Sequence, residues 1–254
     1  MLGRGVKAKG TASQFDDSYL VAIYDEDNPD GEDHDFFRRL ATATQAQSIV
    51  DLGCGTGILT VTLTGSGRSV IGIDPAPAMI KYAQHRPGAH CVEWQVGTSD
   101  QIMPHSADLV IMSGNVAMHM IGDQWYKALK HIAHGLKLGG RLAFETRNPE
   151  NRAWERWSHE QTTRKTVIGR LNETTVIEPP DQQGVVVMRS HREFLESGYM
   201  VDTVQRLQFR SYEQITEALE QAGLRVERCY RSWSCEPFTG GEDQPLMIFT
   251  AAKY

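Results

Sequence analysis

The chain has 254 residues and a formal net charge of −6; 40% of its residues are apolar and 23% are charged. This composition is ordinary for a globular protein, so we expect a packed core, either one large α/β domain or a core domain with an insertion. The acidic charge argues against a nucleic-acid partner, because proteins that bind nucleic acid usually present a basic face. No apolar run approaches the roughly 20 residues that a membrane-spanning helix needs, so we expect no membrane partner.

The beginning of the chain and the cysteines bear on localisation. The first ten residues carry Arg4, Lys7 and Lys9 but no apolar stretch behind them, which predicts a loose tail and no signal peptide. The four cysteines show no Cys-x-x-Cys spacing, which argues against a zinc site and a disulfide framework. Free thiols fit a reducing compartment, so we expect a cytoplasmic protein.

Strand-like and helix-like segments alternate from residue 48 to residue 145. The strand-like runs are residues 48–52, 70–73, 91–96, 108–112 and 141–145. Between them lie helical runs at 58–63 and 78–85, and a longer helix that Asp123 is expected to cap and a glycine pair at 139–140 to end. The expected buried face of that longer helix consists of Tyr126, Leu129, Ile132, Ala133 and Leu136. This alternation predicts a parallel sheet wrapped by helices.

The alternation breaks after residue 147. Asn148 and Pro149 predict a helix start, and the segments 166–168, 174–177, 184–195 and 199–209 are strand-like with short turns between them. Consecutive strands without helices predict an inserted antiparallel meander. Ser211 and Gln214 then have the capping-box spacing of a helix, which Gly223 ends, and two last strands are expected at 224–233 and 246–252.

The predicted fold is therefore α/β: a Rossmann-like, mostly parallel seven-stranded sheet with helices on both faces and an inserted antiparallel β cap. Its expected parts are an N-terminal tail and helical lid (1–47), an α/β core (48–147), the cap segment (148–209) and a C-terminal completion of the core (210–254).

A glycine-rich turn follows the first strand. Gly53, Gly55 and Gly57 lack Cβ atoms, so backbone N–H groups and a ligand can approach closely. Asp74 ends the next strand, 23 residues after Asp51, and an acid at about that distance can accept hydrogen bonds from both ribose hydroxyls. An adenosine-type ligand is indicated.

The charge of Asp51 decides among such ligands. We expect this carboxylate at the mouth of the turn, where it would repel the pyrophosphate of a dinucleotide. S-adenosylmethionine has no phosphate and carries a sulfonium and an α-ammonium group, both of which a carboxylate attracts. The sequence therefore predicts S-adenosylmethionine and disfavours a nicotinamide-dependent oxidoreductase.

These motifs resemble those of the class I S-adenosylmethionine-dependent methyltransferases. The resemblance rests on the run DLGCGTG at 51–57, on Asp74, and on the segments 108–115 and 136–142. The resemblance covers residues 48–145 well, and for residues 211–252 it is limited to the order of the expected elements. It is specific to the superfamily and indicates much less about the substrate.

The resemblance implies a role for each site residue. Asp51 and the turn residues Gly53, Cys54, Gly55 and Gly57 would lie under the methionine part, and Asp74 would hold the ribose. Adenine would lie near Pro75, Thr98 and Ser99. Many relatives have an acid where Thr98 stands, so Asp100 is an alternative contact. Ser113 and Asn115 would line the cofactor floor, and Tyr19 and Tyr24 would form a lid or be ordinary packing aromatics.

The acceptor is expected at the carboxyl ends of the strands. His119 is the first candidate base, with packing at a helix start as the alternative. We expect Glu145 and Arg147 to point opposite ways, so that only one faces the pocket, or to form a salt bridge at the sheet edge; Arg147 could orient an acceptor carboxylate or phosphate. Trp154 and Trp157 would share a helix face, as core packing or as an aromatic wall.

The sequence thus predicts a methyltransferase that acts on an N or O atom of a small-molecule acceptor, as a monomer or homodimer and without a metal. Two alternatives stay open. The acceptor could be a protein or RNA, or the chain could bind S-adenosylmethionine as a regulatory protein without turnover.

Overall fold

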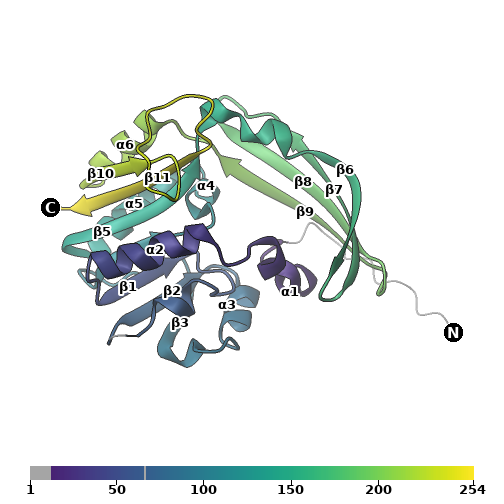
Figure 1. Cartoon of the computed structure of the whole chain (residues 1–254), viewed down its shortest axis with the longest axis horizontal. Coiled ribbons are helices and arrows are strands. Elements are labelled where there is room, and N and C mark those ends of the chain that lie inside the picture. The colour runs from purple at the N-terminus through teal and green to yellow at the C-terminus, as the bar shows by residue number, and fades with distance from the viewer. Residues whose placement is uncertain (1–12, 66) are drawn as a thin grey trace.

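The computed structural model of the chain describes residues 13–65 and 67–254, and the expected tail at residues 1–10 lies outside them. Two sheets form the molecule, one of seven strands and one of four (Figure 1). The predicted fold class is confirmed. Among the described residues, no helix has both the length and the apolar character needed to cross a membrane.

The seven-stranded sheet forms the core. Its strands run in the order β10-β11-β5-β4-β1-β2-β3. Pairing between β1, β2, β3, β4 and β5 is parallel, whereas β11 is antiparallel to both of its neighbours. The bounds are β1 Ser48–Leu52, β2 Ser69–Asp74, β3 Val92–Val96, β4 Ala107–Met112, β5 Leu136–Arg147, β10 Leu224–Tyr230 and β11 Leu246–Lys253. Because β1 to β5 are parallel, their carboxyl ends meet at one edge, where the glycine turn lies.

Helices cover both faces of this sheet (Figure 1). On one face α2 (Glu32–Ala43) buries Phe36 and Phe37. On the other face α5 (Asp123–Gly135) and α6 (Tyr212–Gln221) bury Trp125 and Leu219. The capping box of α6 is present as expected. The remaining helices of the core are the short α3 (Pro77–Ala83) and α4 (Val116–His119).

Some expected element boundaries are wrong. The cap residue of α5 is Gly122 rather than Asp123, and the helix ends at Gly135, before β5 begins. Its buried face starts from Trp125, while Tyr126 is 46% exposed, because Trp125 shares the helical spacing of Leu129 and Ile132. The helical run expected at 58–63 is a 3-10 turn at Thr60–Leu63, and the one expected after Asn148 is a 3-10 turn at Pro149–Asn151.

The antiparallel meander forms the second sheet, which we call the cap. Its strands pair in chain order: β6 His159–Thr166, β7 Gly169–Glu178, β8 Val185–Phe194 and β9 Tyr199–Gln208. The strand expected at 166–168 is wrong, since Val167 and Ile168 form the turn between β6 and β7. The sequence hid β6 because this edge strand is polar and mostly exposed, so it lacks the apolar alternation of a half-buried strand.

Helix α1 (Ser18–Asp27) lies between the core and the cap (Figure 1). Leu20 and Ile23 pack in one apolar cluster with cap residues, and Val21 packs in another with Met79 of α3. The Tyr199 hydroxyl of the cap also donates a hydrogen bond to Asp17, the N-cap of α1. The helix therefore holds the cap against the edge of the core where the parallel strands end.

Candidate active site

The glycine turn after β1 has a backbone that suits glycine. Gly53, Gly55 and Gly57 have φ values of +76°, +53° and +75°, a region that L side chains rarely adopt. A Cβ on Gly53 would lie 2.5 Å from a Val116 methyl carbon, and a Cβ on Gly57 would lie 2.5 Å from the Trp94 ring. The turn is thus fixed by close packing as well as by its dihedral angles.

Asp74 at the end of β2 shapes this turn. Its two carboxylate oxygens accept hydrogen bonds from the Gly55 N–H (2.9 Å) and the Ala76 N–H (2.8 Å). Burial raises the pKa of this carboxyl. The predicted contact of Asp74 with a ribose stays a prediction, because the contacts in the structure are with backbone groups.

Asp51 lies behind the turn instead of at its mouth. The side chain is 1% exposed, and one oxygen accepts a hydrogen bond of 2.6 Å from the Thr60 hydroxyl. The other oxygen has no hydrogen-bond partner among the described residues. Burial raises the pKa of Asp51 to about 6. Its position follows from β1, where Asp51 points to the same face as the buried Ile49.

A cavity of about 340 Å³, which we call the turn cavity, opens above the glycine turn. Its lining includes the predicted residues Tyr24, Gly53, Cys54, Gly55, Ser113, Asn115, Glu145 and Arg147. Asp51 and Gly57 are not among the described residues that line it.

Glu145 and Arg147 both line the turn cavity, so the expectation that they point opposite ways is wrong. Residues two apart on a strand share a face. Glu145 is 3% exposed, and it accepts a hydrogen bond of 2.5 Å from the Asn115 N–H. Burial raises the pKa of Glu145 to about 7 and lowers the pKa of Arg147. The expected salt bridge between them is not among the ion pairs of the described residues.

Gly53 also lines a second cavity of about 490 Å³, which we call the side cavity. The predicted adenine residues Pro75, Thr98 and Ser99 lie on its wall together with the alternative, Asp100. The Thr98 hydroxyl donates to the Asp100 carboxylate (2.5 Å). The structure therefore brings these residues together.

A third cavity of about 520 Å³, the cap cavity, lies between α1, the core edge and the inner face of the cap. Six residues line both it and the turn cavity: Tyr24, Asp27, Asn28, Gly114, Asn115 and Arg147. His119 lines the cap cavity and the side cavity, and burial lowers its pKa to about 4. The turn cavity and the cap cavity thus meet at the ends of β4 and β5.

Comparison with known proteins agrees with this geometry. Residues 49–140 match a family model described as a methyltransferase domain. Over 170 residues the chain is 32% identical to the ubiquinone/menaquinone biosynthesis C-methyltransferase of Rubrivivax gelatinosus, covering 61% of this chain and 65% of the relative. It is 30% identical over 170 residues to glycine N-methyltransferase of Homo sapiens, covering 57% of each chain. The match thus spans about three fifths of the length of these relatives.

A solved structure extends the likeness to the whole fold. A sugar N-methyltransferase from Streptoalloteichus superposes with a TM-score of 0.75 at 17% identity, covering 100% of this chain and 98% of the other. At this identity the superposition establishes a shared fold. Residues 49–140 thus contain a methyltransferase domain, and this match together with the shared fold is consistent with a class I S-adenosylmethionine-dependent methyltransferase.

The residues around the turn fit the cofactor of this superfamily. Two acceptor atoms of residues that line the turn cavity, Asn115 Oδ1 and Glu145 Oε2, are buried and have no hydrogen-bond partner in the described part of the chain. A ligand with an ammonium group and ribose hydroxyls supplies the hydrogen-bond donors that these oxygens lack, and its sulfonium is attracted by the Glu145 carboxylate, whereas a pyrophosphate would add further acceptors. The site therefore suits S-adenosylmethionine.

Tyr24 and Tyr19 on α1 differ in their surroundings. The Tyr24 ring would lie 3.6 Å from a Cβ on Gly55, so it covers the turn. Burial raises the pKa of Tyr24 to about 12, and nearby carboxylates, Asp74 first among them, contribute. Tyr19 instead stacks on Tyr199 of the cap with ring centroids 4.2 Å apart. Tyr19 was expected to be either a lid residue or an ordinary packing aromatic, and its contacts are those of a packing aromatic.

Trp154 and Trp157 share one packing partner but differ in whether they line a cavity. Both pack against Phe209, with ring centroids 4.7 Å and 5.6 Å away. Trp157 in addition lines the cap cavity. The expected helix with both tryptophans on one face is wrong, because the segment Ala153–Arg156 is a 3-10 turn and Trp157 is its C-cap residue.

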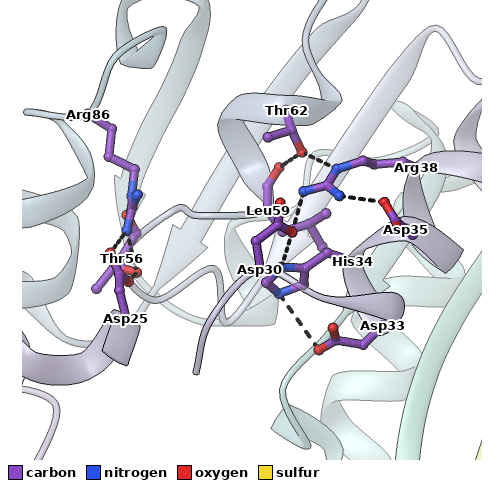
Figure 2. A network of polar contacts seen from close by, with 10 residues as sticks. All are labelled: Asp25, Asp30, Asp33, His34, Asp35, Arg38, Thr56, Leu59, Thr62 and Arg86. Atoms are coloured by element: carbon purple, nitrogen blue, oxygen red, sulfur yellow. Dashed lines mark hydrogen bonds and ion pairs between the residues drawn. The ribbon is translucent and has the colours of Figure 1, made fainter. Parts of the chain in front are cut away.

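Two polar clusters near the turn were missed by sequence reasoning (Figure 2). In the first, Arg86 Nε donates to the Thr56 carbonyl (2.5 Å), the Thr56 hydroxyl donates to Asp25 (2.5 Å), and Arg86 forms an ion pair with Asp25. Since Asp25 lies on α1, this cluster ties α1 to the glycine turn. We call it the latch.

The second cluster joins α2 to the 3-10 turn that follows the glycines (Figure 2). Arg38 donates to the Thr62 hydroxyl (2.9 Å) and pairs with Asp30 and Asp35, and His34 lies 2.8 Å from Asp30. The sequence carries no local signal for the contacts that join the elements, because Asp25 and Arg86 lie 61 residues apart and Arg38 and Thr62 lie 24 residues apart.

Proposed function

We propose that this chain transfers a methyl group from S-adenosylmethionine to a nitrogen or oxygen atom of a small-molecule acceptor. The observation that carries the proposal is the junction of the turn cavity with the cap cavity, which share six lining residues. A cofactor held at the turn and an acceptor held under the cap would therefore meet, and the N-methyltransferases among the similar proteins support such an acceptor.

Apart from Asp51 and Gly57, the proposed cofactor contacts keep their predicted roles. The backbone of Gly53, Cys54 and Gly55 and the side chains of Ser113 and Asn115 would contact the methionine part, with Asp51 and Gly57 supporting the turn from behind. Asp74 would hold the ribose, and Pro75, Thr98 and Ser99 the adenine, while Tyr24 would cover the site. When bound, the cofactor supplies a methyl group on a positively charged sulfur; as an electron pair of the acceptor bonds to the methyl carbon, the sulfur leaves with the electrons of the carbon–sulfur bond.

The protein's own contribution would be alignment, exclusion of water and, where the acceptor must lose a proton, a base. His119 is neutral at physiological pH because burial lowers its pKa to about 4, and it lines the cap cavity. It could therefore accept a hydrogen bond from the acceptor. Glu145, with a pKa of about 7, lines the turn cavity and could take up a proton near neutral pH. Arg147 lines both cavities and would orient the acceptor.

The size of the cap cavity favours a small acceptor. Its volume of about 520 Å³ lies within the range of roughly 300–1,000 Å³ that is usual for small-molecule sites. The cap and α1 also cover the junction, so a duplex or a folded protein surface would not reach it without displacing them.

The test uses the whole chain with isotopically labelled S-adenosylmethionine and a whole-cell extract of the source organism, which is afterwards separated into small-molecule, protein and RNA fractions. We expect label in a low-mass product. Label only in the protein or RNA fraction would overturn the small-molecule acceptor, and cofactor binding without any labelled product would favour the regulatory alternative.

The role of His119 is tested by His119→Asn, with His191→Asn as the matched control. His191 is 53% exposed on its side chain and pairs with Asp202 of the cap. We expect His119→Asn to slow turnover about a hundredfold, the lower end of what a positioned proton acceptor contributes, while the control keeps the wild-type rate. Wild-type rates across pH for His119→Asn would remove His119 from the reaction.

A further inference from the structure

The inner face of the cap is apolar at both ends and polar in the middle. At one end Leu171 and Phe194 pack with Leu20 and Ile23 of α1, and at the other end Val186 and Leu207 pack with Met118 of α4. Between them, Thr175, Arg192 and Gln205 line the cap cavity. This polar stretch faces the space where the acceptor would lie.

Arg192 is the charged group of that stretch. Its side chain is 16% exposed, and one of its Nη atoms donates to the Thr203 hydroxyl (3.2 Å). Its Nε lies 3.4 Å from a Glu173 oxygen but makes no hydrogen bond to the described residues. The guanidinium is thus held on the cap with hydrogen-bonding capacity left over.

The carboxylates near Arg192 are already engaged. Glu173 accepts a hydrogen bond of 2.8 Å from Arg164 Nε, so two arginines share it. Arg164 in turn donates to Asp27 (2.6 Å), the acidic residue that lines the cap cavity. The two carboxylates and the two arginines of this cluster balance in charge, so Arg192 offers a ligand its remaining hydrogen-bond donors and not an uncompensated charge.

Arg147 approaches the same cavity from the core side, at the end of β5. It is not among the arginines that form ion pairs within the described residues, and its buried Nε has no hydrogen-bond partner there. The Arg147 side chain is half-buried, and leaving its buried Nε without a hydrogen-bond partner is costly, so an anion bound between the two walls would satisfy it.

We propose that the acceptor carries an anionic group, a carboxylate or a phosphate, which Arg147 and Arg192 bind from opposite walls of the cap cavity. This assignment rests on the proposed function and names the acceptor class for that site. The reacting nitrogen or oxygen lies toward Asn115 and Gly114, where the cap and turn cavities meet, and the anionic group lies toward the cap.

Arg192 is the residue that separates this proposal from a role in cofactor binding. Arg147 also lines the turn cavity, where it could contact the carboxylate of the methionine part. Arg192 lines the cap cavity and is not among the described residues of the turn cavity. A loss caused by Arg192 alone therefore reports on the acceptor.

The first experiment identifies the labelled product of the whole chain. Mass spectrometry before and after esterification with deuterated methanol counts carboxylates, and treatment with phosphatase detects a phosphate ester. We expect one of the two reactions to shift the product mass. A labelled product that neither reaction changes would overturn the anionic acceptor while leaving the methyltransferase proposal intact, whereas absence of cofactor binding would overturn the proposed function itself.

The second experiment compares Arg192→Leu with Arg189→Leu. Arg189 is on the same strand, is exposed, and pairs with Glu178 away from the cavity. We expect Arg192→Leu to lower kcat/KM for the isolated acceptor at least about tenfold, mostly through KM, with unchanged affinity for S-adenosylhomocysteine; Arg189→Leu should keep wild-type values. Arg192→Lys, which keeps the charge but not the planar fork, should recover part of the loss.

Two results would contradict this assignment. A wild-type KM in Arg192→Leu would show that the guanidinium does not bind the acceptor. Equal losses of acceptor and S-adenosylhomocysteine binding would mean that the substitution disturbs the whole site instead of one contact.

Discussion

The glycine turn and the cap face each other across connected cavities, yet they are built from different parts of the chain. At the turn, backbone groups form the surface: three glycines with positive φ, held by Asp74 and by close contacts with Val116 and Trp94. On the cap, side chains form the surface, and Arg192, Thr175 and Gln205 stand on strands whose own hydrogen bonds do not depend on them. A backbone-built site tolerates few substitutions, whereas a side-chain-built site can change its ligand while its fold persists.

The largest loss of stability should follow from replacing a glycine of the turn by alanine. Gly53→Ala combines a positive φ with a Cβ that would lie 2.5 Å from Val116, so we expect it to lower the free energy of unfolding by about 2–5 kcal/mol. It should also weaken binding of S-adenosylhomocysteine. The measurement is chemical denaturation together with a binding titration.

Gly139→Ala is the matched control for that variant. Gly139 has the same φ of +76°, but a Cβ there would meet open space. Only the backbone cost of about 1–2 kcal/mol is expected. Equal losses in the two variants would show that the contact with Val116 does not constrain the turn.

A smaller effect on stability should come from the ionisation of Glu145, whose buried carboxyl lies between the turn and the cap. The pKa of Glu145 rises from its ordinary 4.5 to about 7 in the folded protein, so the folded state holds this proton more tightly than the unfolded state. Stability without cofactor should therefore fall as the pH rises from about 4.5 to 7 and level off above 7, with a contribution of up to about 3 kcal/mol.

Glu145→Gln removes that proton and keeps the shape of the side chain. Urea denaturation between pH 5 and pH 8 should give a flatter stability curve for the variant, with the remaining slope below pH 6 due to Asp51, whose pKa is also raised. Parallel curves for the variant and the wild type would mean that Glu145 is ionised across the whole range.

Much of the turn was predictable because its signals are local. Three glycines after a β-branched strand, and an acid 23 residues after Asp51, specify a strand, a turn and a second strand within one short segment. The capping box of Ser211 was equally local. The placement of Glu145 and Arg147 on one face also followed from the two-residue period of a strand, and the expectation of opposite faces misapplied that period.

The remaining parts of the site depend on contacts between distant segments. Strand β6 is a polar edge strand without alternation, and the latch joins Asp25 to Arg86 across 61 residues. Arg192 lies in a strand where polar residues occur on both faces, so the sequence did not indicate which of them turn inward. Asp51 behind the turn was missed because the sequence gives the order of residues on β1 and not which side packs against Thr60.

The smallest effect concerns the latch that joins α1 to the turn. The side chains of Arg86 and Asp25 are only 17% and 26% exposed, so a double-mutant cycle with Arg86→Met and Asp25→Asn should give a coupling energy of about 1–2 kcal/mol. Both single variants should also weaken S-adenosylhomocysteine binding, because Tyr24 lies on the same helix.

The pair Arg170 and Glu196 of the cap serves as the control for the latch. Their side chains are 64% and 49% exposed, so the same cycle should give at most about 0.5 kcal/mol. A latch coupling as small as this control value would show that α1 is held mainly by its apolar contacts.

The acidic side chains near the turn favour a cationic ligand over an anionic one. Titration calorimetry of the whole chain with S-adenosylmethionine and, separately, with NAD tests this directly. We expect binding of S-adenosylmethionine, which at about 100 times its Kd should stabilise the fold by roughly 2.7 kcal/mol, and no detectable binding of NAD. Binding of NAD without binding of S-adenosylmethionine would contradict the account.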